Sequence, residues 1–284
     1  MKLVMFSKHL APLSIEEAAR RAGELGFEGL DLTVRPGGHI EPADALDALP
    51  KAVELVRGLG LDIPMITTGI TSADDPHADD IFQAAAESGV RDLKLGYWRY
   101  EGFGSMRRQI EEAREALDGI AALAEKHEVR ANLHIHSGNF LTADAAVVWQ
   151  LLLGRNPDVI GAYIDPGHMT VEGGSGGWRM GMDLLTPWIN LVAIKAMAWF
   201  HEYDAELGQE RWSTRLVPLS QGLVPWREFF TYLHDIGFDG TISLHSEYQG
   251  SHSWRDLSLE ELLAQTKEDL AFIKQVISET FHNE

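Results

Sequence analysis

Short apolar runs with strand character alternate along the whole chain with segments of helical periodicity. This alternation is typical of repeated βα units built around a parallel sheet. The expected strands are residues 2–6, 28–32, 62–66, 92–96, 130–135, 160–164, 191–195 and 241–245. Eight βα units in 284 residues match the size and rhythm of a closed barrel. The sequence therefore predicts an α/β fold, a single (β/α)8 TIM barrel over residues 1–284.

The main alternative is an open, doubly wound sheet, which favours a glycine-rich phosphate loop after its first strand. Here the first strand leads into FSKHLAPLS, which contains neither a GxGxxG motif nor a Walker loop. The first helix is expected to begin at Ser14, with Glu17 at the capping-box spacing, and to close at Gly26. Pro50 leaves open whether the second helix is one piece or two. The helix near residues 178–188 has the weakest signals.

Two segments are longer than a barrel requires, one at about 33–42 and one at about 196–224. Both follow strands, so both are expected on the face where TIM-barrel active sites are built. Long loops at that face more often shape a pocket than fill space. We therefore expect both segments to border a functional site.

The composition excludes several classes of function. The chain has no Cys, which rules out disulfides, cysteine-ligated zinc and cysteine nucleophiles. Its formal net charge is −19 and it has no basic block, whereas nucleic-acid binding needs a basic surface. No stretch reaches the roughly 18 apolar residues of a membrane span, and the N-terminal segment lacks the features of a signal peptide. We expect a cytoplasmic protein with no nucleic-acid or membrane partner.

Residue types that bind metals or transfer protons stand where four of the predicted strands end. The carboxyl ends of all strands in a parallel barrel converge on one face, so these residues can share one pocket. They are His134, His136, Asp165, His168, Lys195, His245 and Glu247. Alternate residues of a strand face the same side, which places His134 with His136 and His245 with Glu247. Imidazole and carboxylate without thiolate suit a transition metal better than calcium.

Each of these residues also has a purely structural interpretation. Two histidines often alternate on a strand by chance, without binding a metal. Asp165 can cap the turn that follows it. Lys195 can extend its ammonium to the rim of the barrel or offer its charge to an oxygen-rich substrate. A buried carboxylate without a partner is costly, and a metal or a positive group would relieve that cost at Asp165. The sequence leaves these alternatives open.

Further residues are expected to contact a substrate. His39 follows the flexible pair Gly37-Gly38 in the first long segment. Aromatic residues follow the fourth and seventh strands, where rings can stack on the apolar faces of sugars or act as hydrophobic lids. They are Tyr97, Trp98 and Trp199.

Four segments carry a resemblance to a known family. Residues 14–32 read as a helix that leads through a Gly-Phe-x-Gly turn into an apolar-acidic strand, and residues 160–168 as a strand ending in Asp-x-x-His. Residues 192–199 (VAIKAMAW) and 237–248 (GFDGTISLHSEY) follow as the next and last strands. Together they resemble the sugar phosphate isomerase/epimerase superfamily of xylose isomerase-like barrels, over nearly the whole chain. That superfamily also includes tagatose-type epimerases, inosose dehydratases and endonuclease IV.

The resemblance implies a metal site that this chain matches unevenly. Where the family has a Glu at the end of the fifth strand, this chain has His134. Asp165 matches the second ligand, and His168 the adjacent substrate-contacting His. The usual third ligand, a His, is replaced by Ala193, while the neighbouring Lys is kept as Lys195. The fourth ligand, a Glu, corresponds to either His245 or Glu247, so epimerisation by a pair of Glu residues is in doubt.

The resemblance implies an isomerase, epimerase or lyase acting on a sugar, keto-sugar or cyclitol by proton abstraction next to a carbonyl, assisted by a divalent metal. The expected cofactor is Mn, Zn, Co, Fe, Ni or Mg, unless the Ala193 replacement has removed the metal. The expected metal ligands are His134, Asp165, Glu247 and His245. The expected catalytic residues are His245, Glu247, His136 and Lys195. The expected substrate contacts are His39, His168, Tyr97, Trp98 and Trp199.

The alternative is a catalytically silent or metal-free sugar-binding barrel, which Ala193 favours. A DNA-repair endonuclease of the endonuclease IV type would need more metal ligands and a basic groove, which the net charge of −19 opposes. The expected partner is a small-molecule carbohydrate, without a phosphate group because no phosphate-gripping loop is visible. Neither the substrate's identity nor a homo-oligomeric state is decided by the sequence.

Overall fold

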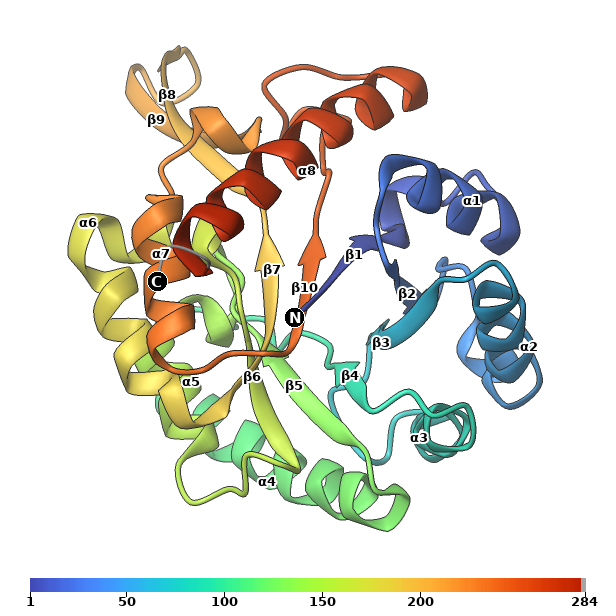
Figure 1. Ribbon diagram of the computed structural model, residues 1–284. Coiled ribbons are helices and arrows are strands. Elements are labelled where there is room, and N and C mark those ends of the chain that lie inside the picture. Colours follow the sequence, from blue (N-terminus) through green and yellow to red (C-terminus); the bar gives the residue numbers. More distant parts are fainter. Residues whose placement is uncertain (282–284) are drawn as a thin grey trace.

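The computed structural model describes residues 1–281 and shows a closed barrel of parallel strands surrounded by helices (Figure 1). The barrel strands are β1 Lys2–Phe6, β2 Gly29–Val34, β3 Asp62–Thr68, β4 Asp92–Lys94, β5 Arg130–His134, β6 Ile160–Ile164, β7 Ile189–Ile194 and β10 Thr241–Leu244. They pair in the order β1-β10-β7-β6-β5-β4-β3-β2, and the last strand returns to the first. The predicted (β/α)8 barrel is therefore confirmed, and all eight predicted strands are present.

The main helices lie between the strands and cover the outside of the barrel (Figure 1). They are α1 Ile15–Leu25, α2 Ala45–Gly58, α3 Ala78–Glu87, α4 Met106–His127, α5 Ala145–Leu152, α6 Pro166–Leu185, α7 Trp226–Asp235 and α8 Leu259–Phe281. Single 3-10 turns accompany them at η1 Ser7–Leu10, η2 Pro42–Asp44, η3 Leu141–Ala143, η4 Thr186–Trp188 and η5 Leu219–Gln221. Within residues 1–281, none of the helices has both the length and the apolar character needed to cross a membrane.

The local signals in the sequence explain how these helices begin and end. The capping box at the start of α1 is present, since the Ser14 hydroxyl accepts from the Glu17 amide and the Glu17 carboxylate accepts from the Ser14 amide. Gly26 ends the helix at a φ of 96°, a left-handed conformation that glycine adopts without strain. Pro50 lies inside α2, which forms one helix because its apolar face is buried in the core. Helix α6 is interrupted at Gly174, where the backbone leaves the helical region.

The segment at 196–224, expected as a long loop, forms an antiparallel hairpin instead. Its strands are β8 Ala196–Asp204 and β9 Gln209–Val217, and η5 follows. The Leu216 amide donates to the His252 carbonyl, and the Trp254 amide donates to the Leu216 carbonyl, at 2.9 and 2.8 Å. These bonds tie the hairpin base to the loop after β10, and Figure 1 shows the hairpin extending beyond the barrel. Cross-strand bonding satisfies backbone groups that a long loop would leave to water.

The alternation of side chains along each strand separates two apolar regions. Outward residues such as Ile164 and Val192 join the large core between strands and helices. Inward residues form a small cluster of Met65, Tyr163, Leu191 and Ala193 in the barrel. The residue two positions beyond an inward residue also faces inward. Asp165 follows Tyr163 in this way, and Lys195 follows Ala193, so both side chains enter the barrel at its carboxyl end.

Candidate functional site

Two adjoining cavities open at the carboxyl ends of the strands. The inner cavity, of about 70 Å³, is lined by Phe6, Lys8, Arg35, Thr67, Lys94, Tyr97, His134, His136, Tyr163, Lys195, His245 and Glu247. The outer cavity, of about 340 Å³, reaches the hairpin and adds Ser137, His168, Met197, Thr214, Leu216 and His252. Both contain Lys8, His136, Lys195 and Glu247, so we treat them as one cleft, called the barrel cleft below. The hairpin forms one wall of its outer part.

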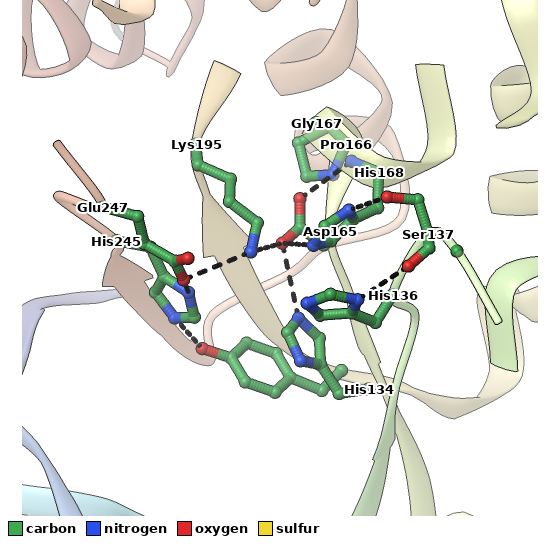
Figure 2. Close-up of polar contacts among 12 residues, drawn as sticks. His134, His136, Ser137, Asp165, Pro166, Gly167, His168, Lys195, His245 and Glu247 are labelled. Carbon is green, nitrogen blue, oxygen red and sulfur yellow. Dashed lines mark hydrogen bonds and ion pairs between the residues drawn. The ribbon is translucent and has the colours of Figure 1, made fainter. Parts of the chain in front are cut away.

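The ammonium of Lys195 lies at the centre of the barrel cleft, between two carboxylates (Figure 2). Its Nζ is 3.3 Å from Asp165 Oδ2 and 3.5 Å from Glu247 Oε1. The Lys195 and Asp165 side chains are buried, and the Glu247 side chain is nearly so. Burial alone would lower the pKa of Lys195, but the charges of Asp165 and Glu247 outweigh it and leave the pKa raised. Lys195 is therefore a fixed cation.

Glu247 is the most strongly paired carboxylate of the cleft. Besides Lys195, its oxygens face Lys8 Nζ at 3.6 Å and His9 Nε2 at 3.9 Å. Burial would raise the pKa of Glu247, but the charge of Lys195 and the adjacent His245 ring hold it well below its usual range. Glu247 is therefore ionised at neutral pH.

His134 is held in one tautomer by its two neighbours. Its Nε2 is 3.3 Å from Asp165 Oδ2, and its Nδ1 is 2.7 Å from the Tyr97 hydroxyl. A carboxylate only accepts, so Nε2 carries the proton and Nδ1 accepts from Tyr97. Burial lowers the pKa of His134 well below its usual range, and the nearby Lys195 and Lys94 lower it further. The ring is thus a neutral hydrogen-bonding element rather than an acid.

His136 and His168 pack ring against ring, with centroids 3.9 Å apart. His136 Nδ1 lies 2.9 Å from the Ser137 carbonyl, so Nδ1 carries the proton and Nε2 keeps its lone pair. Burial lowers the pKa of His136 to about 4. His168 Nδ1 bonds to the Ser137 hydroxyl at 2.6 Å, and its Nε2 is 3.7 Å from Asp165 Oδ2. His136 is therefore a neutral base at pH 7, and the packing of His168 against its ring holds that ring in place.

His245 connects the cleft to a buried polar group beneath it. Its ring is stacked on Phe6, Nε2 is 2.9 Å from the Tyr163 hydroxyl, and Nδ1 is 3.6 Å from Glu247 Oε1. Burial lowers the pKa of His245 to about 4. Tyr163 in turn reaches Asp31 Oδ2 at 3.4 Å. His245 is thus neutral. It lies between Glu247 and the Tyr163 hydroxyl, which leads to the buried Asp31.

Asp31 lies on β2 and is completely buried inside the barrel. Thr67 and Ser243 donate hydroxyl hydrogen bonds to its two oxygens at 2.8 and 2.9 Å. Burial raises the pKa of Asp31 to about 6, although these hydrogen bonds lower it. The hydroxyls therefore provide only part of the solvation that the carboxylate has lost.

A second lysine, Lys94, lies in the cleft and pairs with no carboxylate of the described part of the chain. It is the last residue of β4, its side chain is 2% exposed, and its Nζ sits 3.5 Å from the centre of the Tyr97 ring. Within residues 1–281 it forms no ion pair. An aromatic ring stabilises a desolvated cation by about 2 kcal/mol, whereas burying an ammonium costs several kcal/mol. Burial, with Arg35 nearby, accordingly lowers the pKa of Lys94 well below its usual range.

The predicted metal ligands come together, but their arrangement does not fit a divalent ion. The two carboxylates, Asp165 and Glu247, already converge on the Lys195 ammonium, which a metal between them would have to displace. Where the resemblance implies a His ligand, the chain has Ala193, which is fully buried in the apolar cluster. Within residues 1–281 no group of three His, Asp or Glu side chains is arranged to hold a metal. Lys195 therefore supplies the positive charge of this site.

The structure places the other predicted substrate contacts differently. Tyr97 lines the inner cavity. His39 lies outside both cavities, where its Nδ1 bonds to the Thr33 hydroxyl at 3.1 Å. Trp98 packs against the core, and Trp199 is 45% exposed on the hairpin. None of the three lines the cleft, but Trp199 lies opposite Thr214 and so shares the hairpin face that carries Met197 and Leu216 of the outer cavity.

Several residues of the cleft were not predicted from the sequence. They are Lys8, His9, Asp31, Arg35, Thr67, Lys94 and Tyr163. A signal for two of them was available. Lys94 stands in an apolar strand (DLKLG) as Lys195 does, and Tyr163 alternates with Asp165 and so shares its face. The others lie on strands or loops whose direction into the barrel no local pattern indicates.

Comparisons with known proteins agree with this architecture. Residues 2–276 match the family described as xylose isomerase-like TIM barrel. No curated protein matches the chain in sequence. Among solved structures, an L-ribulose 3-epimerase superimposes with a TM-score of 0.74 at 17% identity, covering 99% of this chain and 96% of that one.

Two further solved structures are similar. A 3-keto-D-glucoside 4-epimerase from E. coli has a TM-score of 0.70 at 13% identity, with 97% of this chain and 99% of that one covered. A xylose isomerase-like TIM barrel protein from Mycobacterium smegmatis, in complex with magnesium, has a TM-score of 0.69 at 16% identity, with 99% and 97% covered. At such identities the likeness establishes the fold alone.

Proposed function

The chain belongs to the xylose isomerase-like TIM barrel family, and from this premise we propose that it is a carbohydrate isomerase, epimerase or lyase. Its substrate is a small polyhydroxylated carbonyl compound, such as a keto-sugar or a cyclitol ketone. The reaction begins with removal of a proton from the carbon next to the carbonyl. Two of the structural neighbours are named as sugar epimerases, which supports this class of reaction.

One observation carries the proposal, namely a fixed cation with neutral imidazoles on two sides of it. His136 and His168 lie on one side of the Lys195 ammonium and His245 on the other (Figure 2). Proton transfer at a sugar carbon needs groups on both faces of the substrate. A cation in a water-poor cleft stabilises the negative charge that develops on the carbonyl oxygen. The arrangement therefore supports enolisation with Lys195 at the oxygen.

Each side chain has a defined part in this proposal. His136 is the base, because its Nε2 lone pair is free and burial keeps its pKa at about 4. His245, with Glu247, is the proton-transfer group on the other side. His168 Nε2 and His245 Nδ1 have no hydrogen-bond partner among the described residues, although both are buried. Buried polar atoms normally find a partner, and substrate hydroxyls would provide one.

The proposal is tested by isotope exchange. The protein, dialysed against a chelator, is incubated in D2O with D-fructose, D-tagatose, L-ribulose and an inosose. We expect deuterium to enter the carbon next to the carbonyl of at least one of them, as measured by proton NMR. The His136→Asn variant should slow this exchange by about 100- to 10,000-fold, the range typical of a lost general base.

A matched control is His77→Asn. His77 is exposed, lines neither cavity of the cleft, and adopts a φ of 64°, a conformation that Asn tolerates well. This variant should exchange deuterium at the wild-type rate. If sugars raise the melting temperature but no exchange occurs with any of them, the catalytically silent sugar-binding barrel becomes the better interpretation. Exchange that requires an added divalent ion would contradict the role given to Lys195.

A further inference from the structure

The barrel cleft contains two buried lysines whose surroundings differ. Lys195 faces two carboxylates, whereas Lys94 faces the Tyr97 ring, and the nearby cations Arg35, Lys195 and Lys8 act on its charge. We propose that Lys94 is a nucleophile that forms a covalent imine with the carbonyl carbon of the substrate. This inference rests on the proposed function only in that the cleft must admit a carbonyl compound.

The geometry leaves the Lys94 amine one direction in which to react. Lys94 ends β4, and its side chain lines the inner cavity together with His134, Tyr163 and His245. One side of its Nζ is covered by the Tyr97 ring at 3.5 Å. Tyr97 is held there by the hydrogen bond of its hydroxyl to His134 Nδ1. A ligand in the cavity is therefore the partner that the buried amine can reach.

The charges around Lys94 favour its neutral, reactive form. Burial is the main cause of its lowered pKa, and the cations Arg35, Lys195 and Lys8 lower it further, while Asp31 opposes them. Asp31 is engaged by three hydroxyl groups instead, those of Thr67, Ser243 and Tyr163. A lysine desolvated beside another cationic group is the usual arrangement for an amine that attacks carbonyls. Lys195, with its raised pKa, lacks this character.

Groups of the cleft and water are sufficient for each step of imine formation. The Lys94 nitrogen lone pair attacks the carbonyl carbon, the C=O π pair moves to oxygen, and a proton passes from nitrogen to that oxygen to give a carbinolamine. The C–O bond then breaks as the C=N bond forms, and the oxygen, which accepts a hydrogen bond from the Lys195 ammonium, leaves as water after receiving a proton from solvent. A base removes the adjacent C–H proton to give an enamine. Reprotonation of carbon and hydrolysis return the free lysine.

This chemistry explains how a site that does not fit a metal could still acidify a C–H bond. A protonated imine withdraws electrons from the adjacent carbon, as a Lewis acid at the carbonyl oxygen would. His136 or His245, both neutral, can take the proton. Lys94 would thus bind covalently to the carbonyl carbon, while the Lys195 ammonium donates a hydrogen bond to the departing oxygen.

Reductive trapping tests the proposal directly. Wild-type protein is incubated with dihydroxyacetone and sodium cyanoborohydride, which reduces an imine to a stable secondary amine, and is then digested and mapped by mass spectrometry. We expect one adduct per chain, on the peptide that contains Lys94. Modification confined to exposed lysines, or no modification, would overturn the proposal. Because this measurement uses the wild-type chain, it does not depend on whether a variant folds.

Two variants complete the test. Lys94→Arg keeps the positive charge but cannot form an imine, so it should lose the adduct and slow deuterium exchange by at least about 100-fold. Lys51→Arg, an exposed lysine paired with Asp47, is the matched control and should keep both. If deuterium exchange persists in Lys94→Arg and the wild-type protein gives no adduct, the imine is contradicted but the proposed function stands. An adduct on Lys94 without deuterium exchange into any sugar would support the imine and contradict the proposed function.

Discussion

Replacing Lys195 by methionine is expected to lower the free energy of unfolding by about 3–5 kcal/mol, the usual cost of removing one partner from a buried ion pair. The change leaves Asp165 and Glu247 facing each other with no cation between them. Neither carboxylate can turn to water, since Asp165 is fully buried and the Glu247 side chain is only 12% exposed. Urea unfolding of both proteins at pH 7.5, followed by tryptophan fluorescence, measures the difference.

The same substitution should also remove most of the activity. Lys195 is the positive group proposed to stabilise charge on the substrate oxygen, and loss of one such group typically slows a reaction by about 100- to 1,000-fold. Deuterium exchange into the substrate that the wild-type protein turns over provides the measurement. A Lys195→Met protein that folds and exchanges at the wild-type rate would contradict the central role of this ammonium.

Two controls separate the buried pair from ordinary surface charge. Lys51→Met removes an exposed lysine that pairs with Asp47 on α2, and it should cost less than about 1 kcal/mol. The double variant Lys195→Met/Asp165→Asn removes a buried charge of each sign, so it should recover a large part of the lost stability. A loss in Lys195→Met no greater than in Lys51→Met would mean that the two carboxylates are well solvated.

Acidification from pH 6.5 to pH 4 is expected to remove most of the stability of the fold. Burial lowers the pKa of His9, His136 and His245 to about 4, and that of His134 and His168 still further. In the unfolded chain these histidines titrate near pH 6.5. As the pH falls through this window the unfolded state binds protons that the folded state does not, so unfolding becomes more favourable.

The magnitude follows from linkage between proton binding and unfolding. Each histidine whose pKa burial lowers to about 4 contributes about 3 kcal/mol of lost stability by pH 4. Asp31, Asp165 and Asp269 act in the opposite direction, because burial raises their pKa, to about 6 for Asp31 and Asp269, and the folded state takes up their protons first. Five histidines against these three carboxylates leave a net loss comparable to a typical total stability of 5–15 kcal/mol.

Urea unfolding at intervals between pH 7.5 and pH 4.5 tests this expectation. The free energy of unfolding should fall steadily below pH 6.5, and the protein should unfold without urea near the acid end. His168→Gln removes one buried titrating ring, so its curve should be less steep over the same window. His77→Gln, at an exposed histidine, should leave the slope unchanged. A free energy of unfolding that is flat between pH 7.5 and pH 5 would contradict the buried, neutral state of these rings.

Much of the fold was predictable because its signals are local. A strand repeats every two residues and a helix every 3.6, and both periods can be read within a short window. All eight barrel strands were predicted in this way, as was the capping box at Ser14. The 196–224 segment was not, since the pairing of Ala196 with Val217 depends on contacts between distant residues. Hairpins with long strands and a polar surface carry weak periodic signals.

The candidate site was predictable to the extent that strand ends determine it. His134, His136, Asp165, His168, Lys195, His245 and Glu247 were named from sequence, and the structure brings them into one region. His39 and Trp98 were named too, but they line neither cavity, because a position after a strand does not fix where a loop side chain points. Trp199 lies beside the outer cavity, on the hairpin face of Met197 and Thr214, without lining it. The roles assigned to all these residues stay proposals.

By itself, the sequence determined the barrel and the end of it at which polar residues gather, because alternating apolar runs and strand ends are properties of neighbouring residues. Only the tertiary structure decided that Lys195 lies between Asp165 and Glu247, and that Lys94 has no carboxylate partner among residues 1–281. These facts depend on the closure of the barrel, which sets the distances between strands and buries the charges that they carry. The same two lysines, alike in sequence, acquire opposite pKa shifts from that closure.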